Sequence, residues 1–288
     1  MLDESARTKI RVALDNLDSL PAMPAIAQKL LALPLNTESG EKQLLVLIEQ
    51  DPQISAKLVS LANSPIMGVS RKIVSVKDAS MLLGLTRVKS VALGIASMSS
   101  LVKMKPTENF KPEDLWIHSM MVAIVMRNLA QEMPRASRPP EDQIFLTGLL
   151  HDIGFMALHY IDAAASNALH LILKRQPERP IAEVELEVLG TTHCAIGTQL
   201  ARHWNLPEEI VFAIGNHHPP HKDPAAAQNP MVLLIGIVEK LQSNFGITEH
   251  TGGTVLDQEW RGLGIDPDSA EDIANLADEL AIQIAQQR

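Results

Sequence analysis

The sequence predicts an all-α protein, folded as a two-lobed helical bundle. Apolar residues recur at intervals of three and four along most of the 288 residues, whereas the period-two alternation of a half-buried strand is hard to find. One Tyr and five Phe give little of the aromatic enrichment that strands show. With 46% hydrophobic and 20% charged residues, the chain is long and apolar enough to bury a substantial core.

Start and stop signals locate helices in the first hundred residues. Asp51-Pro52 predicts a helix start, with Asp as the capping residue and Pro in the first turn, and this helix should end near Asn63. A second helix is expected to run without a break from about Asp78 to Met98. Its apolar residues keep helical spacing past Gly84.

Similar signals place helices in the rest of the chain. One helix is expected to begin near Glu113. Another should begin at Pro207, because the acidic pair that follows suits the positive end of a helix, and should stop near Gly215. A last amphipathic helix is expected after Ser269 and Asp272.

A cluster of proline and polar residues from Lys105 to Asp114 divides the chain. We expect an N-terminal helical lobe over residues 1–108 and a second helical lobe over residues 109–245. A C-terminal extension over residues 246–288 should carry the last amphipathic helix. No internal repeat or long low-complexity tract interrupts this plan.

Charge and the length of apolar runs exclude several classes of protein. A net charge of −9 opposes attraction to nucleic acid, which needs clustered Lys and Arg. The longest unbroken apolar stretches, Met120–Met126 and Met231–Val238, are far shorter than the roughly 20 residues of a membrane span. The chain opens with acidic residues, so no secretory signal is expected. These features predict a cytoplasmic protein that binds neither nucleic acid nor membrane.

Cysteine is nearly absent from the chain, with Cys194 as its only copy. A single thiol excludes an intrachain disulfide framework and a thiolate-rich zinc site. We therefore expect cysteine chemistry to play no part in the function.

A histidine and a His-Asp pair are predicted to point into the protein interior. His118 falls on the apolar stripe of its helix, so its imidazole should face inward. His151 is expected on a helix, on the same face as Phe155, and Asp152 follows it directly. Because an unpaired interior carboxylate is costly, Asp152 needs a partner.

The other candidate ligands lie further along the chain. Five of the ten histidines fall between His193 and His221. His193 lies on an apolar stripe, and His217-His218 follows a short helix in a loop, where ligands often converge. The remaining histidines have no comparable context and are expected to be structural or surface residues: His159, His170, His203, His221 and His250.

Two interpretations of these residues remain open from composition and spacing. In one, Asp152 pairs with a protonated His118 or with backbone donors, and the other histidines are ordinary hydrogen-bonded residues. In the other, the imidazoles and the carboxylate together bind Zn²⁺, Fe²⁺ or Mn²⁺, with three ligands and a water in an open site.

The chain resembles the HDOD family of bacterial signalling proteins, relatives of the HD-domain metal-dependent phosphohydrolases. The resemblance covers roughly Leu20 to Leu241, and its motifs occur in the family's order. They are Leu20-Pro21-Ala22-Met23-Pro24, Gln50-Asp51-Pro52, Leu61-Ala62-Asn63-Ser64, Ala79 with Leu82-Leu83-Gly84, Thr147-Gly148-Leu149-Leu150-His151-Asp152-Ile153-Gly154, Glu185 with Leu189-Gly190 and His193, Trp204-Asn205-Leu206-Pro207 and His217-His218.

The resemblance implies an HD-like lobe over residues 109–245 and a set of metal ligands within it. His118 matches the first ligand of HD enzymes, and His151-Asp152 matches their central pair. The resemblance to the HD-GYP cyclic di-GMP phosphodiesterases adds three histidines, which are His193, His217 and His218. The downstream Asp of the HD family is missing between residues 231 and 246, where Glu239 is the possible replacement.

Two departures from the HD-GYP pattern argue against catalysis. Phe155 stands where those enzymes have a Lys, and no Gly-Tyr-Pro element follows His218. Cyclic di-GMP hydrolysis is therefore not expected, because the cation that would stabilise the developing charge is lost.

Two functions follow from the resemblance. The first is a signal-transduction module that binds receiver or cyclic-dinucleotide signalling proteins and keeps a degenerate metal or ligand pocket, with Fe, Mn or Zn as the possible ion. The alternative is a metal-dependent phosphohydrolase that acts on a nucleotide or other phosphoester. Its ligands would be His118, His151 and Asp152, with His217 or His218 on the phosphate.

Overall fold

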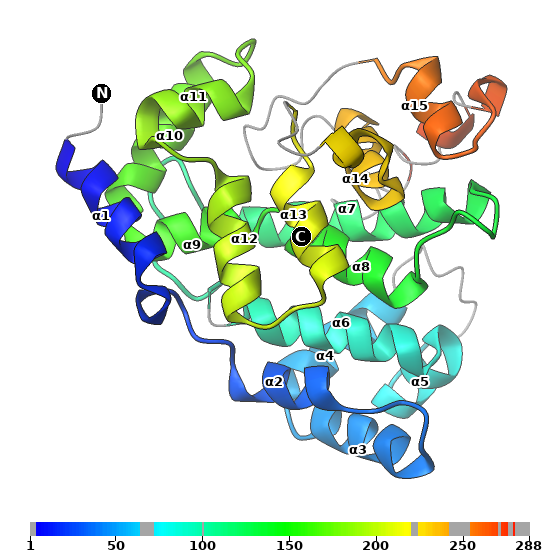
Figure 1. Ribbon diagram of the computed structural model, residues 1–288. Helices are drawn as coiled ribbons and strands as arrows, with labels where there is room; N and C mark the ends of the chain where they lie inside the picture. The colour runs from blue at the N-terminus through cyan, green and yellow to red at the C-terminus, as the bar shows by residue number, and fades with distance from the viewer. Residues whose placement is uncertain are drawn as a thin grey trace.

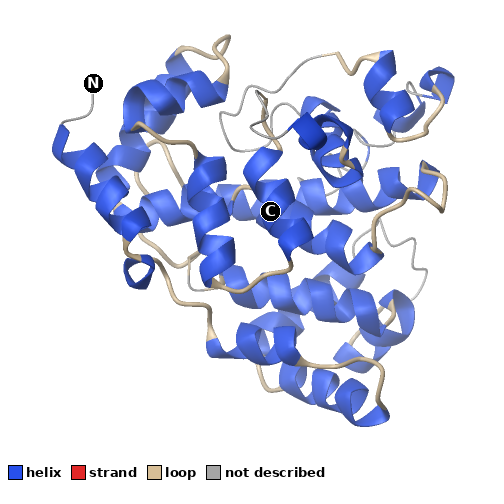
Figure 2. Ribbon diagram, viewed as in Figure 1, coloured by secondary structure: helices blue, strands red, loops and turns tan. Residues whose placement is uncertain are grey.

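The computed structural model describes residues 4–63, 72–99, 101–219, 224–241, 254–269, 272–275 and 279. Within these residues the chain is helical and contains no strand (Figure 2), which confirms the all-α prediction. The helices of the first hundred residues are α1 (Glu4–Asp15), α2 (Ala25–Ala32), α3 (Glu38–Glu49), α4 (Pro52–Ala62), α5 (Val76–Leu83) and α6 (Leu85–Met98), with a 3-10 turn at Leu17–Ser19.

The rest of the described chain carries nine α-helices and two 3-10 turns. The helices are α7 (Pro112–Glu132), α8 (Glu141–Leu150), α9 (Ile153–Ile161), α10 (Ala163–Arg175), α11 (Ile181–Leu189), α12 (His193–His203), α13 (Glu208–Asn216), α14 (Pro230–Leu241) and α15 (Asp257–Gly262). The 3-10 turns are Pro224–Gln228 and Pro267–Ser269.

Local capping explains where several helices begin, and one prediction of a continuous helix is wrong. The Asp51 side chain accepts hydrogen bonds from the backbone N–H groups of Gln53 and Ile54, at 2.9 and 3.0 Å, so α4 starts where expected. The helix expected from Asp78 to Met98 is two helices, α5 and α6. Gly84 separates them with a φ of 80°, a left-handed conformation that favours glycine.

The helices α2 to α6 lie together at one end of the molecule, and α7 and α8 cross its middle (Figure 1). One hydrophobic core includes buried residues from Ile10 to Ile214, and a second includes buried residues from Val122 to Ile265. The first core therefore joins residues from both sides of position 108. The boundaries at 108 and 245 stay predictions.

Residues of the N-terminal motif are anchored on the C-terminal half of the chain. The indole N–H of Trp204, at the end of α12, donates a 2.8 Å hydrogen bond to the carbonyl of Pro21. In the N-terminal half, the Asn63 side-chain amide donates to the carbonyl of Ile73 and accepts from its N–H, at 2.7 and 2.8 Å. These hydrogen bonds give the motif residues a role in holding the fold together.

Two glycines let helices approach closely enough to build the site. A Cβ at Gly148 in α8 would lie 2.6 Å from the Cα of Ala123 in α7, so α8 can pack directly on α7 only because position 148 lacks a side chain. A Cβ at Gly154 in α9 would collide with the carbonyl oxygen of His193 at the start of α12. Gly154 therefore allows α12 to bring His193 next to Asp152.

One described segment is long and apolar enough to cross a membrane by composition. It runs from Glu141 to Ile161, contains α8 and α9, and is 94% buried inside the protein. Such burial is typical of the core helices of a globular protein. The predicted C-terminal amphipathic helix falls mostly outside the described residues, which include only 272–275 and 279 of that part of the chain.

Candidate metal centre

The seven predicted ligand residues converge in one buried cluster. His118 comes from α7, His193 from the start of α12, His217 and His218 from the end of α13, and Glu239 from α14. All seven side chains belong to buried residues, and His151, Asp152 and His193 have no exposed surface. They are His118, His151, Asp152, His193, His217, His218 and Glu239.

The sequence predicts that His151 and Asp152 lie on a helix, but the structure places them in a turn between two helices. His151 caps the C-terminal end of α8, and Asp152 precedes α9 in the turn between the two helices. Because the chain turns here, the two side chains of adjacent residues can face the same point. Nε2 of His151 lies 3.1 Å from Oδ2 of Asp152.

The Asp152 carboxylate stands at the centre of the cluster. Oδ2 faces His118 Nε2 at 3.4 Å as well as His151, whereas Oδ1 faces His193 Nε2 at 3.5 Å and His217 Nε2 at 3.4 Å. All four contacts lie at ion-pair distance, and together they lower the pKa of the buried Asp152 carboxyl well below its usual range. Each carboxylate oxygen therefore lies next to a different pair of imidazoles.

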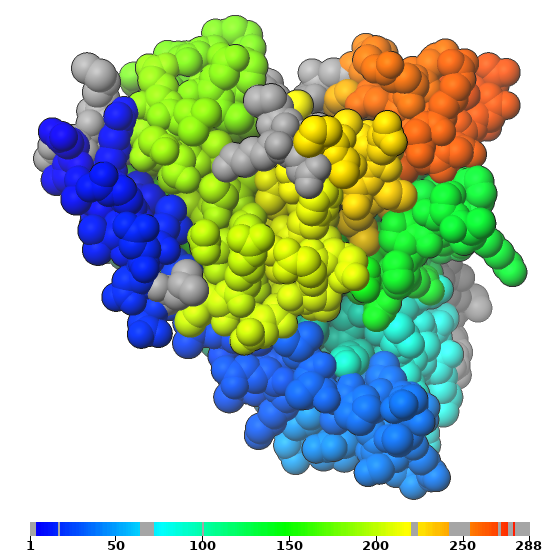
Figure 3. Space-filling view, in the orientation of Figure 1, coloured from blue at the N-terminus to red at the C-terminus, as the bar shows by residue number. Residues whose placement is uncertain are grey.

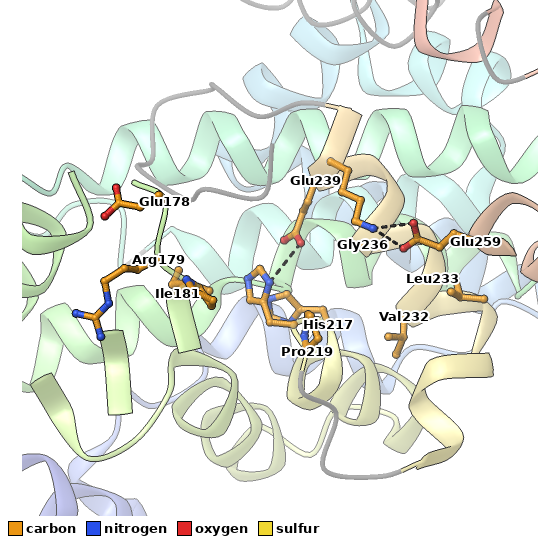
Figure 4. Close-up of a pocket in the computed structure, with 13 residues that line it drawn as sticks. Glu178, Arg179, Ile181, His217, Pro219, Val232, Leu233, Gly236, Glu239 and Glu259 are labelled. Atoms are coloured by element: carbon orange, nitrogen blue, oxygen red, sulfur yellow. Dashed lines mark hydrogen bonds and ion pairs between the residues drawn. The ribbon is translucent and has the colours of Figure 1, made fainter. Parts of the chain in front are cut away.

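Glu239, the predicted replacement for the missing Asp, lies within the cluster. Oε1 of its carboxylate lies 3.3 Å from His151 Nε2, and Oε2 lies 3.7 Å from His218 Nδ1, a contact drawn in Figure 4. The glutamate thus reaches both sides of the cluster.

Three of the imidazoles are oriented by hydrogen bonds at Nδ1. His151 donates to the Gly148 carbonyl at 2.7 Å, and His217 donates to the Ile214 carbonyl at 2.8 Å. His193 donates to Oε1 of Glu185 at 2.8 Å. With a proton fixed on Nδ1, the neutral ring presents its Nε2 lone pair to the centre of the cluster, as metal-binding histidines commonly do.

The inward-facing atoms fit divalent metal ions. Nε2 of His193 and Nε2 of His217 are 3.1 Å apart, and two lone pairs at that distance repel unless a cation lies between them. An ion bonded at about 2.0–2.1 Å with tetrahedral angles holds its donors about 3.3–3.4 Å apart. The measured separations of 3.1, 3.4 and 3.5 Å between His193, His217 and Asp152 agree with this spacing.

The ligand atoms form two groups of four that share Asp152. Within each group, the candidate ligand atoms all lie within 4.8 Å of one another. One group is His118, His151, Asp152 and Glu239, and the other is Asp152, His193, His217 and His218. A carboxylate between two such groups is the arrangement of a bridging ligand in a two-metal site.

The electrostatics of the cluster also suit cations. Burial alone would lower the pKa of His151, but the carboxylates of Asp152 and Glu239 outweigh it and raise this pKa to about 10. Burial would raise the pKa of Glu239, but His218 and His151 outweigh it and lower this pKa to about 2. The paired carboxylates thus attract positive charge, which protons or metal ions can supply in competition with each other.

Three neighbours of the cluster were not predicted as functional. Glu185 in α11 is buried and orients His193, and it stands among the motifs of the family resemblance, which assigned it no role. Phe155 stacks on His193 with ring centroids 4.1 Å apart, so this position now supports a ligand instead of supplying a cation. The buried thiol of Cys194 lies 3.5 Å from His193 Nε2.

The other described histidines stand outside the cluster. His159 and His170 are buried and donate hydrogen bonds to the backbone carbonyls of Lys105 and Ser166, at 2.9 and 2.7 Å. His203 is half-buried at the end of α12. His221 and His250 lie outside the described residues.

A cavity of about 410 Å³ opens onto the cluster. His217, His218 and Glu239 form part of its wall (Figure 4). Lys240 also borders it and is held by Oε1 and Oε2 of Glu259 in α15, at 2.6 and 2.7 Å. The volume falls in the range of small-molecule sites, roughly 300–1,000 Å³.

Comparison with known families identifies the chain. The HDOD domain profile matches residues 20–220. The chain belongs to the HDOD family. Helices α14 and α15 lie beyond the residues that the HDOD profile matches.

Solved structures share the HDOD fold over almost the whole chain. A proposed signal transduction protein from Marinobacter aquaeolei VT8 is 25% identical, with a TM-score of 0.76 over 98% of this chain and 65% of that chain. An HDOD domain protein of unknown function from Geobacter sulfurreducens is 24% identical, with a TM-score of 0.72 over 96% and 98%. A proposed metal-dependent phosphohydrolase from Shewanella amazonensis SB2B is 20% identical, with a TM-score of 0.64 over 97% and 99%.

One curated relative is an uncharacterised protein of Treponema pallidum (strain Nichols). It is 25% identical over 221 residues, which make up 75% of this chain. The chain spans 41% of the length of that relative.

Proposed function

We propose that this protein is a bacterial signal-transduction module whose HD-type pocket holds a pair of divalent metal ions. The observation that carries the proposal is the carboxylate of Asp152, which belongs to both groups of candidate ligands and lies within 3.5 Å of imidazole nitrogens in each. Fe, Mn and Zn all suit the mixture of imidazole and carboxylate donors. The signalling part rests on membership of the HDOD family and on the description of the Marinobacter protein.

Metal content tests the proposal directly. Protein purified without chelator, or loaded with Mn²⁺ or Fe²⁺, is expected to hold about two ions per chain by elemental analysis. The content of both ions should fall strongly in Asp152→Asn, because the substitution removes the charged ligand that the two groups share while keeping the side chain's shape. Asp142→Asn, the same change at an exposed position of α8, is the matched control and should keep both ions. Wild-type protein that takes up no metal would contradict the proposal.

Metal-dependent phosphoester hydrolysis is the second candidate function, and the cavity beside the ligands favours it. A two-metal centre can activate water and stabilise the leaving oxygen. His118, His151, Asp152 and Glu239 would hold one ion, whereas Asp152, His193, His217 and His218 would hold the other. A panel of phosphodiesters and nucleotides tests this function with the metal-loaded protein. Turnover that Asp152→Asn abolishes supports hydrolysis, and no turnover by a fully loaded protein contradicts it.

A protein partner is the third element of the proposal. Val74 and Met81, just before and within α5, are 70% and 66% exposed although both are apolar. They offer a surface to a receiver or cyclic-dinucleotide signalling protein in the cytoplasm. Tagged protein should retain such a partner, and Val74→Asp with Met81→Asp should release it. Retention of the same partner by the double variant would exclude this surface.

A further inference from the structure

Gly236 in α14 is a glycine that neither backbone conformation nor close packing explains. Of the described glycines, Gly84, Gly190 and Gly264 have positive φ values that favour glycine. A Cβ at the other glycines would come within 3.0 Å of a neighbouring atom, except at Gly236, where nothing lies within 4 Å. A glycine inside a helix destabilises it by about 0.5–1 kcal/mol relative to alanine.

The empty space beside Gly236 belongs to the cavity on the metal centre. Leu233, Gly236 and Lys240 lie at intervals of three and four on one stripe of α14, and all three border the cavity. Glu239, three residues after Gly236, belongs to the metal-ligand cluster and also borders the cavity. A side chain at position 236 would therefore extend into the space next to the ligands (Figure 4).

Away from the ligands, the cavity has an apolar part of its wall and a charged part, the latter formed by Glu178, Arg179, Lys240 and Glu259. Pro180 and Ile181 border the cavity from the start of α11, and Val232 and Leu233 border it from α14. The innermost part of the wall is polar, formed by His217, His218 and Glu239. A molecule with a negatively charged end and a flat apolar body matches the polar innermost part and the apolar part of the wall.

We infer that Gly236 is a specificity residue that keeps the cavity open for the organic part of a small phosphorylated ligand whose phosphoryl group binds at the metal centre. The inference rests on the proposed metal centre and adds the class of ligand and the residue that admits it. Gly236 lies beyond residues 20–220, which the HDOD profile matches.

Two phosphonates separate binding of the phosphoryl group from binding of the organic part. Methylphosphonate and phenylphosphonate carry the same anionic group, and neither contains a phosphoester bond that the protein could hydrolyse. Calorimetric titration of the Mn²⁺-loaded protein should give about tenfold or more tighter binding of phenylphosphonate, since the cavity removes one aromatic ring from water.

Gly236→Leu should fill the cavity while leaving every metal ligand in place. We expect this variant to bind the two phosphonates with nearly equal affinity, and methylphosphonate as the wild type does. Gly236→Ala is the matched control, because one methyl group meets no atom within 4 Å, and it should keep most of the preference for phenylphosphonate. Metal content and Tm are measured for both variants to show that they are loaded and folded.

The possible outcomes separate this inference from the proposed function. A loaded wild-type protein that binds both phosphonates equally, or a Gly236→Leu variant that keeps the preference, would overturn the inference and leave the metal centre standing. A wild-type protein that takes up no Mn²⁺ would contradict the proposed function, and the inference with it. Suppose that Gly236→Leu keeps two ions but loses the preference for phenylphosphonate, whereas Gly236→Ala keeps that preference. This result supports the inference and the proposed function.

Discussion

At the scale of single residues, the candidate site depends on Asp152 and on the groups that orient the histidines around it. Spacing and family resemblance were enough to select the five histidines and Asp152, because these residues occur in recognisable motifs. Glu185 stands in one of the family motifs, but its role could not be predicted, because its contact with His193 depends on how α11 packs near the start of α12. Its carboxylate accepts hydrogen bonds from both Nδ1 and the backbone N–H of His193, at 2.8 and 3.0 Å.

Substitution of Glu239 tests whether this residue replaces the missing Asp. Glu239→Gln keeps the side chain's size but removes the negative charge that lies 3.3 Å from His151. We expect metal content to fall from about two ions to about one per chain, because the group with His193 and His217 keeps its other ligands. Glu259→Gln, the same change on the rim of the cavity, should retain two ions. Two ions in Glu239→Gln would show that Glu239 is dispensable.

At the scale of helices, close contacts determine where the ligands lie. The sequence indicated most of these helices, but it placed the His-Asp pair on a helix and joined α5 to α6. Both errors have the same physical source. Apolar periodicity continues across a turn when the residues on both sides are buried, as they are around His151-Asp152, so the pattern alone cannot locate the break.

The contact of α9 with α12 predicts the effect of Gly154→Ala. The added methyl group would meet the backbone of His193 and lie 2.9 Å from the backbone nitrogen of Gly197, so the helices must separate. We expect the free energy of unfolding to fall by about 1–3 kcal/mol, the usual cost of overpacking a core. Thermal and urea denaturation measure this change. Gly236→Ala, in a helix with free space, should be neutral or stabilising, and an equal loss in both variants would contradict the packing argument.

The Glu141 carboxylate links three helices, and its ion pairs predict part of the loss of fold stability at low pH. Glu141 at the start of α8 forms ion pairs with Arg87 of α6 at 2.5 Å and Arg127 of α7 at 3.3 Å. Burial would raise the pKa of Glu141, but the two arginines outweigh it and lower the pKa below the ordinary 4.5. Because the unfolded chain then binds the proton more readily, the pair stabilises the fold above about pH 4.5 and loses this effect as the pH falls through the lowered pKa.

Glu141→Gln should therefore lower the Tm at pH 7, and the difference from wild type should shrink as the pH is lowered from 5 toward 3. The effect is expected to be modest, since the Glu141 side chain is 35% exposed and solvent screens the pairs. Calorimetric scans at a series of pH values measure it. A difference that stays constant or grows toward low pH would contradict the assignment.

At the scale of the whole molecule, the candidate metal centre brings together distant parts of the chain. Its ligands come from α7, the turn between α8 and α9, α12, the end of α13 and α14, and the last of these packs against α15 (Figure 3). The all-α class was predictable because helical periodicity runs through the chain. The position of α14 over the cluster was not, because it follows from tertiary packing of an apolar helix with only Glu239 to mark it.

Because ions that bind only the folded chain stabilise it, metal removal should lower the stability of the whole protein. Saturation at 100 times the dissociation constant contributes about 2.7 kcal/mol for one site. We expect a chelator to lower the Tm of the wild type by several degrees and to leave the Tm of Asp152→Asn unchanged. An equal effect on both proteins would mean that the stabilising metal binds elsewhere.

Anomalous diffraction from crystals of the metal-loaded protein tests the two-metal centre most directly. Data collected at the absorption edge of the loaded metal should show two peaks per chain, one on each side of the Asp152 carboxylate. One peak should lie among His118, His151 and Glu239, and the other among His193, His217 and His218. A loaded crystal with no peak beside Asp152, or with peaks only at surface residues, would contradict the account.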